Sequence, residues 1–205
     1  NGAELADGTV LRADHYVSAL PFDVLAQTMP DGMMAKPYFS DAAKLESSPI
    51  VGIHLWYDRP IMDPAFVGVL DSPVQWVFNK SKIQGSEGSP GQYVCVSISG
   101  AWDYMEMPKE ELRTLFAAEM ARLFPKARGA QIDRFLVVKQ PQATFRSVPG
   151  VASLRPPQTT PIRNLFIADG SLFVTAGAVN PTNTIQALSL WIADQMKQRL
   201  ANLFD

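Results

Sequence analysis

The stretch that decides the fold is Asn164-Leu-Phe-Ile-Ala-Asp-Gly-Ser-Leu-Phe-Val-Thr-Ala-Gly-Ala-Val-Asn-Pro-Thr-Asn-Thr-Ile185, near the C-terminal end. Its apolar run from Leu165 to Ala168 predicts a short buried strand. Small residues follow, and Asn180-Pro181 then supplies an N-cap and a first-turn proline for a helix. Apolar residues recur beyond it at helical spacing, at Ile185, Leu188, Ile192, Met196 and Leu200. The stretch therefore predicts a strand, a tight turn and an amphipathic helix.

The start of this helix is suited to an anion, because a helix N-terminus carries about half a positive charge and free backbone N–H groups. A reduced flavin carries its negative charge around N1 and O2. A helix that begins at Asn180 and points there would raise the reduction potential of the flavin. The alternative from residue types alone is an ordinary strand–loop–helix connection with a well-capped helix.

The same residues resemble the C-terminal signature of the glucose-methanol-choline oxidoreductases, over about residues 161 to 197. In that family the Asp-Gly pair lies against FAD, the Asn of the Asn-Pro pair is catalytic, and the helix start meets the flavin pyrimidine. The resemblance implies a catalytic role for Asn180. It implies FAD contacts from Asp169, Gly170, Ser171, Val179, Asn180, Pro181 and Thr184.

Composition describes a globular chain with a sizeable core, since 47% of the 205 residues are hydrophobic and 19% are charged. The net charge of −2 gives no electrostatic case for binding nucleic acid. The single cysteine, Cys95, excludes an internal disulfide and favours a cytoplasmic setting. The chain begins at Asn1 in the middle of a pattern, so we expect a piece of a longer protein.

The first third of the chain predicts a hairpin, a strand and two helices. Asp7-Gly8 is a strong turn signal between apolar residues, and His15 to Leu20 reads as a core strand that ends at Pro21. Helices are expected over residues 23–29, with Asp23 as N-cap, and over about 40–45. Residues 47–49 are expected to form a loop.

The middle of the chain predicts an antiparallel sheet with helices on one side. The expected helix opens at Pro108 and runs to about Phe124, and Pro141 to Pro161 reads as an irregular, proline-rich return. The strands are expected over residues 50–58, 66–70, 74–78, 93–99 and 131–139.

This part resembles the squalene-associated FAD-dependent desaturases, a group that includes hydroxysqualene dehydroxylase and is related to phytoene desaturase within the amine oxidase superfamily. The resemblance spans about residues 1 to 163. It implies a flavoenzyme of isoprenoid metabolism, in hopanoid or carotenoid biosynthesis, that acts on a long hydrocarbon. The motifs that carry it are Ser48-Pro-Ile-Val-Gly-Ile-His-Leu-Trp-Tyr-Asp-Arg-Pro60, Ser72-Pro-Val-Gln-Trp-Val-Phe-Asn-Lys80 and Val137-Val-Lys-Gln-Pro-Gln-Ala-Thr-Phe145.

The fold class that follows is α/β, or α+β for the fragment. We expect a Rossmann-like FAD domain completed by both ends of the chain, with an inserted substrate domain built from an antiparallel sheet and helices. Residues 1–22 would supply a hairpin and strand of the FAD domain, 23–141 the substrate domain, and 142–205 the last strand and helix of the FAD domain.

The aromatic strands of the middle segment are candidates for the wall of an apolar substrate tunnel. Side chains alternate along a strand, so one face would pack under the helices and the other would face the substrate. The substrate candidates are His54, Trp56, Trp76 and Phe78. The alternative is that the aromatic residues are plain core and that His54 is a satisfied core or cavity-facing histidine.

Several patterns do not occur in the sequence. No Gly-x-Gly-x-x-Gly follows a strand, so the FAD-binding N-terminal half would be a missing partner. The desaturase pattern ends its last strand in Ala-Gly-Asp, whereas this chain has Ala168-Asp169-Gly170. His15 and His54 have no metal-ligand spacing, so no metal site is expected.

Three functions follow from the sequence as hypotheses. The first is an FAD-dependent desaturase or dehydroxylase of a squalene- or carotenoid-type isoprenoid, cytoplasmic and with a peripheral contact to the inner membrane left open, although no basic amphipathic helix supports that contact. The second is a glucose-methanol-choline type alcohol dehydrogenase. The third is a non-catalytic fragment without cofactor.

Overall fold

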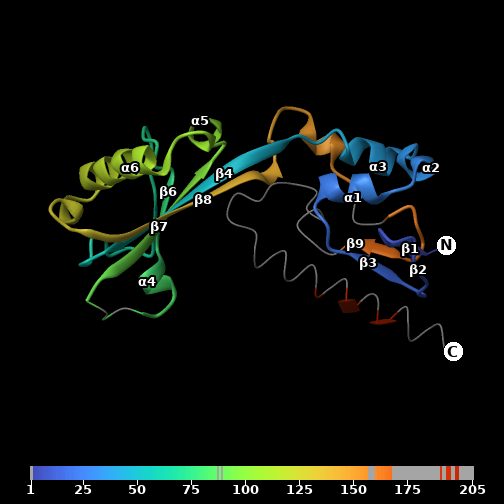
Figure 1. Cartoon of the computed structure of the whole chain (residues 1–205), viewed down its shortest axis with the longest axis horizontal. Coiled ribbons are helices and arrows are strands. Elements are labelled where there is room, and N and C mark those ends of the chain that lie inside the picture. The colour runs from blue at the N-terminus through green and yellow to red at the C-terminus, as the bar shows by residue number, and fades with distance from the viewer. Residues whose placement is uncertain are drawn as a thin grey trace. The chain divides into compact units, whose positions relative to one another are not determined.

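The computed structural model describes residues 2–86, 88, 90–156, 160–167, 190, 193–194 and 197–198. The chain divides into two compact units, which Figure 1 shows in ribbon form. Unit 1 comprises Asn1–Leu45 and Ser147–Asp205, and unit 2 comprises Glu46–Arg146. The sequence-based division placed the two domain boundaries after residues 22 and 141 instead. Which part binds FAD and which binds substrate stays a prediction.

The strands of unit 1 follow the sequence expectation. β1 (Ala3–Glu4) and β2 (Val10–Leu11) form an antiparallel hairpin. Its turn holds Gly8 at a φ of +82°, a conformation that glycine adopts without strain. β3 (Tyr16–Ser18) pairs in parallel with β9 (Leu165–Ile167), a partner almost 150 residues away in the chain. The predicted hairpin and both predicted strands are confirmed.

Short helices connect β3 to unit 2. They are α1 (Phe22–Thr28), α2 (Asp31–Met34) and α3 (Pro37–Ala42), and a 3₁₀ turn, η2, spans Val151–Leu154 later in the chain. Asp23 does not cap α1, because Pro21 is the N-cap residue and Asp23 lies in the first turn. The second helix begins earlier than predicted, since Pro37 takes a first-turn position.

A small buried cluster explains why these helices belong to unit 1. Leu25 of α1 and Ile167 of β9 are each 2% exposed and belong to one cluster. Met29 and Tyr38 pack against it. Residues 23 to 45 therefore belong to the unit that holds the parallel strand pair, although the sequence assigned them to the substrate domain.

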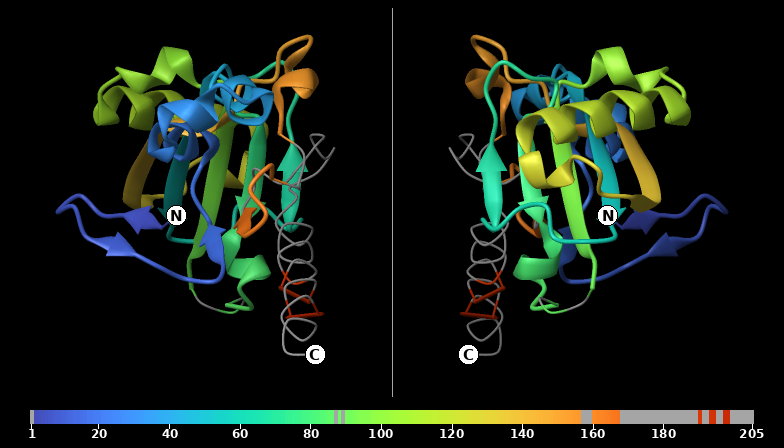
Figure 2. Two further views of the ribbon diagram at one scale, coloured as in Figure 1. Left: turned by 90° about the vertical axis from the view of Figure 1, so that its right-hand side faces the viewer. Right: turned by 90° about the vertical axis from the view of Figure 1, so that its left-hand side faces the viewer.

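Unit 2 is built on a five-stranded sheet with the order β5-β6-β7-β4-β8. Every neighbouring pair is antiparallel, as predicted. Figure 2 shows its long strands side by side. The strands are β4 (Ser47–Tyr57), β5 (Phe66–Gly68), β6 (Trp76–Asn79), β7 (Gln92–Ser99) and β8 (Ile132–Phe145).

Two boundaries of this sheet were predicted wrongly. The expected loop at residues 47–49 is the start of β4, which pairs at Ser47 with Phe145 and at Ser48 with Thr144. The first five residues of the segment expected to be irregular, Pro141 to Phe145, are the end of β8. Proline is tolerated there because β8 is an edge strand and the register shifts between Ser48 and Ile50.

One face of the sheet is covered by α6 (Lys109–Leu123), which confirms the predicted helix (Figure 1). Leu112, Phe116 and Met120 of α6 are completely buried. They pack against alternate residues of the strands, among them Val51, Ile53, Leu55, Val77, Val94 and Val96. The remaining helices of unit 2 are α4 (Lys80–Ile83), α5 (Trp102–Met105) and the 3₁₀ turn η1 (Pro125–Ala127). We call the side of the sheet that α6 covers the core face.

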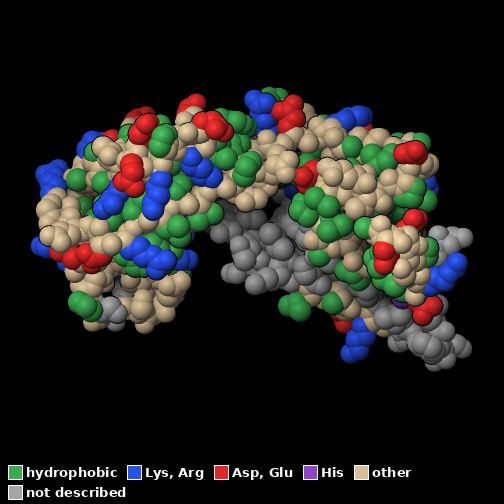
Figure 3. All heavy atoms as spheres, in the orientation of Figure 1, with side chains coloured by type: hydrophobic (Ala, Val, Ile, Leu, Met, Phe, Trp, Pro, Cys, Tyr) green, Lys and Arg blue, Asp and Glu red, His purple; other side chains and the backbone are tan. Residues whose placement is uncertain are grey.

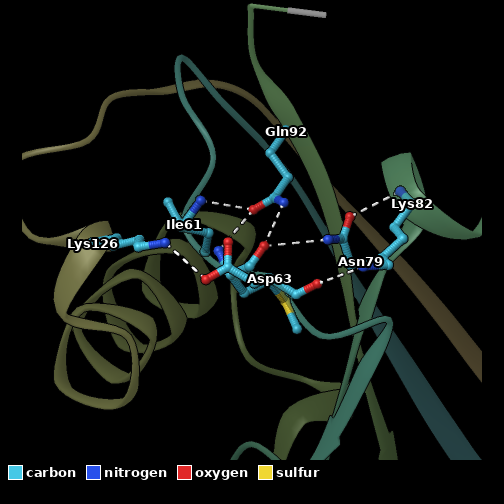
Figure 4. A network of polar contacts seen from close by, with 7 residues as sticks. Ile61, Asp63, Asn79, Lys82, Gln92 and Lys126 are labelled. Carbon is cyan, nitrogen blue, oxygen red and sulfur yellow. Dashed lines mark hydrogen bonds and ion pairs between the residues drawn. The ribbon is translucent and has the colours of Figure 1, made fainter. Parts of the chain in front are cut away.

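Buried amide side chains anchor the segment that follows β4 (Figure 4). The Gln92 Oε1 atom accepts hydrogen bonds from the N–H groups of Ile61 (2.7 Å) and Met62 (3.0 Å). The Nε2 group of Gln92 donates to the carbonyl of Met62 at 2.8 Å. Asn79 Nδ2 donates to the same carbonyl at 3.3 Å, while its Oδ1 caps α4 by accepting from Lys82 N–H. Backbone groups that would cost free energy if left unpaired are thereby satisfied.

Charges of both signs are interspersed over the face of the molecule drawn in Figure 3. The sequence has 18 basic and 20 acidic residues, so no large single-sign field is expected. Within the described residues, no helix is long and apolar enough to cross a membrane.

Candidate functional site

The predicted flavin contacts all lie outside the described residues. They are Asp169, Gly170, Ser171, Val179, Asn180, Pro181 and Thr184. The expected start of the last helix at Asn180 also lies outside them, as do its apolar positions Ile185, Leu188, Ile192, Met196 and Leu200. These assignments stay predictions.

The strand pair that leads into this stretch has the features of a ligand-binding edge. β3 and β9 are parallel, and Ser18 is the register partner of Ile167 at their carboxyl ends. Ligands of open parallel sheets bind at that edge. The hydroxyl of Ser18 is buried and has no hydrogen-bond partner in the described structure. Because an unpaired buried hydroxyl costs about 1–3 kcal/mol, the edge fits a polar ligand such as the phosphate or sugar part of FAD.

The second candidate surface is the side of the unit 2 sheet opposite α6, which we call the aromatic face. It is formed by the alternate residues that do not enter the core, so it can be read in rows across the strands. Arg134, Trp56 and Tyr93 form one row. Leu136, His54, Cys95, Phe78 and Phe66 form the next, and Val138, Gly52, Ser97 and Trp76 form the third.

All four predicted substrate residues lie on this face. His54 and Trp56 come from β4, with ring centroids 6.3 Å apart, and Trp76 and Phe78 come from β6, also 6.3 Å apart. The face is not closed over by unit 2 itself, since Trp76 is 45% exposed. The structure therefore brings the four residues together, and their role in binding substrate stays a prediction.

Planar groups stand side by side in the first row. The rings of Trp56 and Tyr93 stack with centroids 4.4 Å apart and planes 5° from parallel. The guanidinium of Arg134 lies over the other side of Trp56, with Cζ 4.7 Å from the ring centroid. Such a cation–π contact is worth about 0.5–2 kcal/mol. Trp56 is therefore held in one orientation by both neighbours.

A hydrogen-bonded pair lies between the first two rows. The Tyr93 hydroxyl is 2.7 Å from Nδ1 of His54. Burial lowers the pKa of His54, and the nearby charge of Lys80 lowers it further. Burial also raises the pKa of Tyr93, with Cys95 adding to the effect. Both groups are therefore uncharged at neutral pH, which suits an apolar surface.

Sequence reasoning missed several members of the site. Tyr93 lies at the start of a predicted strand but was not named as a site residue, although its alternation with Val94 and Val96 would have placed it on the face opposite these aliphatic residues. That Arg134 belongs to the site can be inferred only from the register of β8 against β4. Ser18 ends a strand that was predicted, but nothing in the sequence marks its hydroxyl as unpaired.

Two hollows among the described residues of unit 2 share no residue with the aromatic face. One of about 560 Å³ lies beside α6 and is lined by Met107, Glu110, Glu111, Thr114 and Leu115. One of about 250 Å³ adjoins Asn79 and Gln92. Neither brings together a set of catalytic groups. No cluster of metal-ligating side chains occurs among the described residues.

Comparison with known proteins identifies the family. Residues 1–179 match the profile of the family described as "Flavin containing amine oxidoreductase". The 15-cis-phytoene desaturase of Synechococcus elongatus is 30% identical over 164 residues, which cover 77% of this chain and 35% of that protein. The zeta-carotene desaturase of Arabidopsis thaliana is 26% identical over 179 residues, covering 78% and 32%. The chain thus spans about a third of the length of these relatives.

Solved structures show the same fold at low sequence identity. Cyclohexylamine oxidase from Brevibacterium oxydans superposes with a TM-score of 0.64 at 15% identity, over 82% of this chain and 39% of that one. Putrescine oxidase bound to putrescine gives 0.65 at 14% identity, over 91% and 43%. The mixed α/β fold predicted from sequence is therefore confirmed. None of these relatives supports the predicted likeness to glucose-methanol-choline oxidoreductases.

Proposed function

Since the chain belongs to the flavin-containing amine oxidoreductases, we propose that its protein desaturates or dehydroxylates a long isoprenoid. The family is one of FAD-dependent oxidoreductases, which agrees with the cofactor and the enzyme class expected from the sequence. The named curated relatives are a phytoene desaturase and a zeta-carotene desaturase, and both names refer to isoprenoid substrates. They support the substrate class, and the squalene-type substrate rests on the sequence resemblance alone.

The observation that carries the proposal is the aromatic face. Phe66 and Trp76 are 59% and 45% exposed, and Leu136 and Val138 across the sheet are 40% and 46% exposed. Contiguous exposed apolar surface of this kind marks a binding site. A long hydrocarbon chain would cover these side chains and gain about 25 cal/mol for each Å² of apolar surface removed from water.

FAD, when bound, would supply the hydride acceptor for a desaturation or, in its reduced form, the hydride donor for a dehydroxylation, and the residues of this chain supply binding and orientation. We assign Asp169 and Gly170 to the ribityl or pyrophosphate part, as the resemblance implies, and Asn180 to the pyrimidine edge. Ser18 fits the same cofactor because its buried hydroxyl needs a polar partner. Trp56, held between Arg134 and Tyr93, would orient the substrate and exclude water.

The direct test uses the full-length protein with its FAD. Release of FAD on denaturation establishes the cofactor, and anaerobic mixing with linear isoprenoids of different lengths tests the chemistry. We expect a long isoprenoid to bleach the visible flavin absorbance. Trp76→Ala should weaken this response several-fold, whereas Trp102→Ala, which removes a similarly exposed tryptophan outside the aromatic face, should not. The proposal would be contradicted if no isoprenoid bleaches the oxidised flavin and none restores the absorbance of flavin that was reduced beforehand, or if both substitutions have equal effects.

We also propose that the enzyme works in the cytoplasm in peripheral contact with the inner membrane, because long isoprenoids reside in bilayers. Co-sedimentation of the full-length protein with vesicles tests this contact. Absence of the protein from the vesicle pellet would refute it.

A further inference from the structure

A polar pair lies in the middle of the aromatic face, where a site for a pure hydrocarbon needs none. His54 sits on the central strand β4, and Leu136 and Cys95 are its neighbours across the sheet. The Tyr93 hydroxyl is hydrogen-bonded to Nδ1 of the imidazole, with 2.7 Å between the two atoms. The other ring nitrogen, Nε2, is therefore the group that this pair presents to a ligand.

The contacts of Nε2 are weak within the described structure. The sulfur of Cys95 is 4.0 Å from it, at the outer limit of a hydrogen bond to sulfur. The same thiol is 3.7 Å from the carbonyl oxygen of Val96, to which it donates. With the thiol proton used there, the sulfur gives Nε2 only a weak contact, whichever ring nitrogen carries the proton. A ring nitrogen left without a strong hydrogen-bond partner in apolar surroundings costs free energy until a ligand supplies one.

The neighbouring row leaves space for the imidazole. A Cβ atom at Gly52 would lie 3.2 Å from Nε2 of His54, closer than an ordinary van der Waals contact. Gly52 is paired with Ser97 on one side and Val138 on the other, so the row beside His54 carries only small residues at its centre. Because Gly52 has no Cβ atom, the imidazole of His54 has room to lie with its Nε2 atom next to this row of small residues.

We propose that Nε2 of His54 binds the hydroxyl group of an isoprenoid alcohol that lies across the aromatic face. Tyr93 and Gly52 are positioning residues, since the first fixes Nδ1 and the second leaves room for the ring. The proposal rests on the proposed function, because it assumes that the aromatic face holds the substrate. It narrows the substrate class from any long isoprenoid to an isoprenoid that carries a hydroxyl group.

A hydroxyl is the functional group that fits best, because it both donates and accepts. It pairs with Nε2 whichever nitrogen of the ring carries the proton, whereas a carbonyl pairs with only one tautomer. A site that hydrogen-bonds a substrate hydroxyl also rejects the analogue that lacks it, since its own polar group is then left unpaired. We expect a preference of about tenfold for the alcohol, the value of one hydrogen bond of this type.

The test compares two probes in the FAD-loaded, full-length protein: geranylgeraniol, and the C20 hydrocarbon with hydrogen in place of its hydroxyl. Dissociation constants are measured from the perturbation of the flavin spectrum. The wild type should bind the alcohol about tenfold more tightly than the hydrocarbon. His54→Phe should abolish this preference without weakening hydrocarbon binding, and His54→Gln, which keeps a donor, should restore part of it. Tyr93→Phe and Gly52→Ala should reduce it by disturbing the ring.

Trp76→Ala is the matched control, because it lies on the same face and two strands away from His54. It should weaken both probes to the same extent and leave their ratio unchanged. If both probes bind but the ratio is near one, or is unaffected by His54→Phe, the assignment of His54 is wrong and the proposed function stands. If neither probe binds the wild type, the proposed function itself fails, and the assignment of His54 fails with it.

Discussion

The two faces of the unit 2 sheet are made from alternate residues of the same strands, yet they differ in almost every physical respect. On β4, Val51, Ile53 and Leu55 point into the core and are completely buried, while His54 and Trp56, which alternate with them, are half-buried. The core face is aliphatic and covered by α6. The aromatic face carries stacked rings, a hydrogen-bonded His–Tyr pair and a guanidinium.

The difference shows how one strand serves stability and binding at once. Core side chains are removed from water when the protein folds, and this burial stabilises the folded state. Aromatic side chains that unit 2 leaves partly exposed contribute less to folding and keep their apolar surface for a ligand. Substitutions on the first face should therefore change the free energy of unfolding, and substitutions on the second should change binding.

The largest effect is expected at Phe116, which is completely buried at the centre of the core face. Phe116→Ala should lower the free energy of unfolding by about 3–5 kcal/mol, through lost burial and the cavity left behind. The equivalent substitution Phe78→Ala, on the aromatic face, should cost no more than about half as much. Denaturant titrations of the two variants measure both values, and equal losses would contradict the distinction between the faces.

A smaller but still large effect is expected at Gln92, which is 7% exposed. Gln92→Leu keeps the approximate volume but removes the acceptor of the Ile61 and Met62 N–H groups. Since each unpaired buried donor costs about 1–3 kcal/mol, we expect a loss of about 2–4 kcal/mol in thermal or denaturant unfolding. The neighbouring exposed residue Gln84 provides the control, because Gln84→Leu should leave stability within about 0.5 kcal/mol of the wild type.

The sequence predicted the faces better than it predicted the ends of the elements. Period-two alternation was enough to place His54 with Trp56, and Trp76 with Phe78, on one side of their own strands, because the pleat allows only two directions. The register of β4 and β6 against β7 puts both pairs on the same face. It did not show that β4 begins at Ser47, since a Ser-Ser-Pro segment reads as a loop unless its pairing with the far end of β8 is known.

Other features depend on strand pairing between distant parts of the chain, so they could not be predicted from the sequence. Arg134 meets Trp56 only because of how β8 pairs with β4. The parallel pairing of β3 with β9, which places Ser18 beside Ile167, joins segments almost 150 residues apart. The flavin contacts predicted from Asp169 to Thr184 lie outside the described residues, so their test is biochemical.

Trp56 should fall between the two faces in its effect on stability. Its ring is half-buried between Tyr93 and Arg134, so Trp56→Ala should cost about 1–3 kcal/mol and also weaken isoprenoid binding. Arg134→Leu removes only the cation–π contact and should cost about 0.5–1 kcal/mol. A double-mutant cycle of these two substitutions isolates their coupling. A coupling free energy of zero would show that the cation–π contact between Arg134 and Trp56 does not contribute to stability.

The smallest effect is a dependence of stability on pH. The pKa of His54 is lowered below its ordinary 6.5 in the folded protein, so the unfolded chain binds a proton first as pH falls. The contribution of His54 is therefore complete above about pH 6.5 and is lost as pH decreases toward the folded pKa. His54→Gln should flatten the unfolding free energy in this range. An unchanged slope would mean that the imidazole titrates as it does in water.

Photo-crosslinking tests the central claim, that the aromatic face binds the isoprenoid, most directly. The FAD-loaded full-length protein is irradiated with a benzophenone-tagged C20 isoprenoid, and the labelled residues are mapped by mass spectrometry with untagged isoprenoid as competitor. The account predicts competable labels on β4, β6 and β7 at aromatic-face residues such as Trp56, Trp76 and Phe78. Competable labels on α6, or on surfaces away from these strands, with none on the aromatic face, would contradict it.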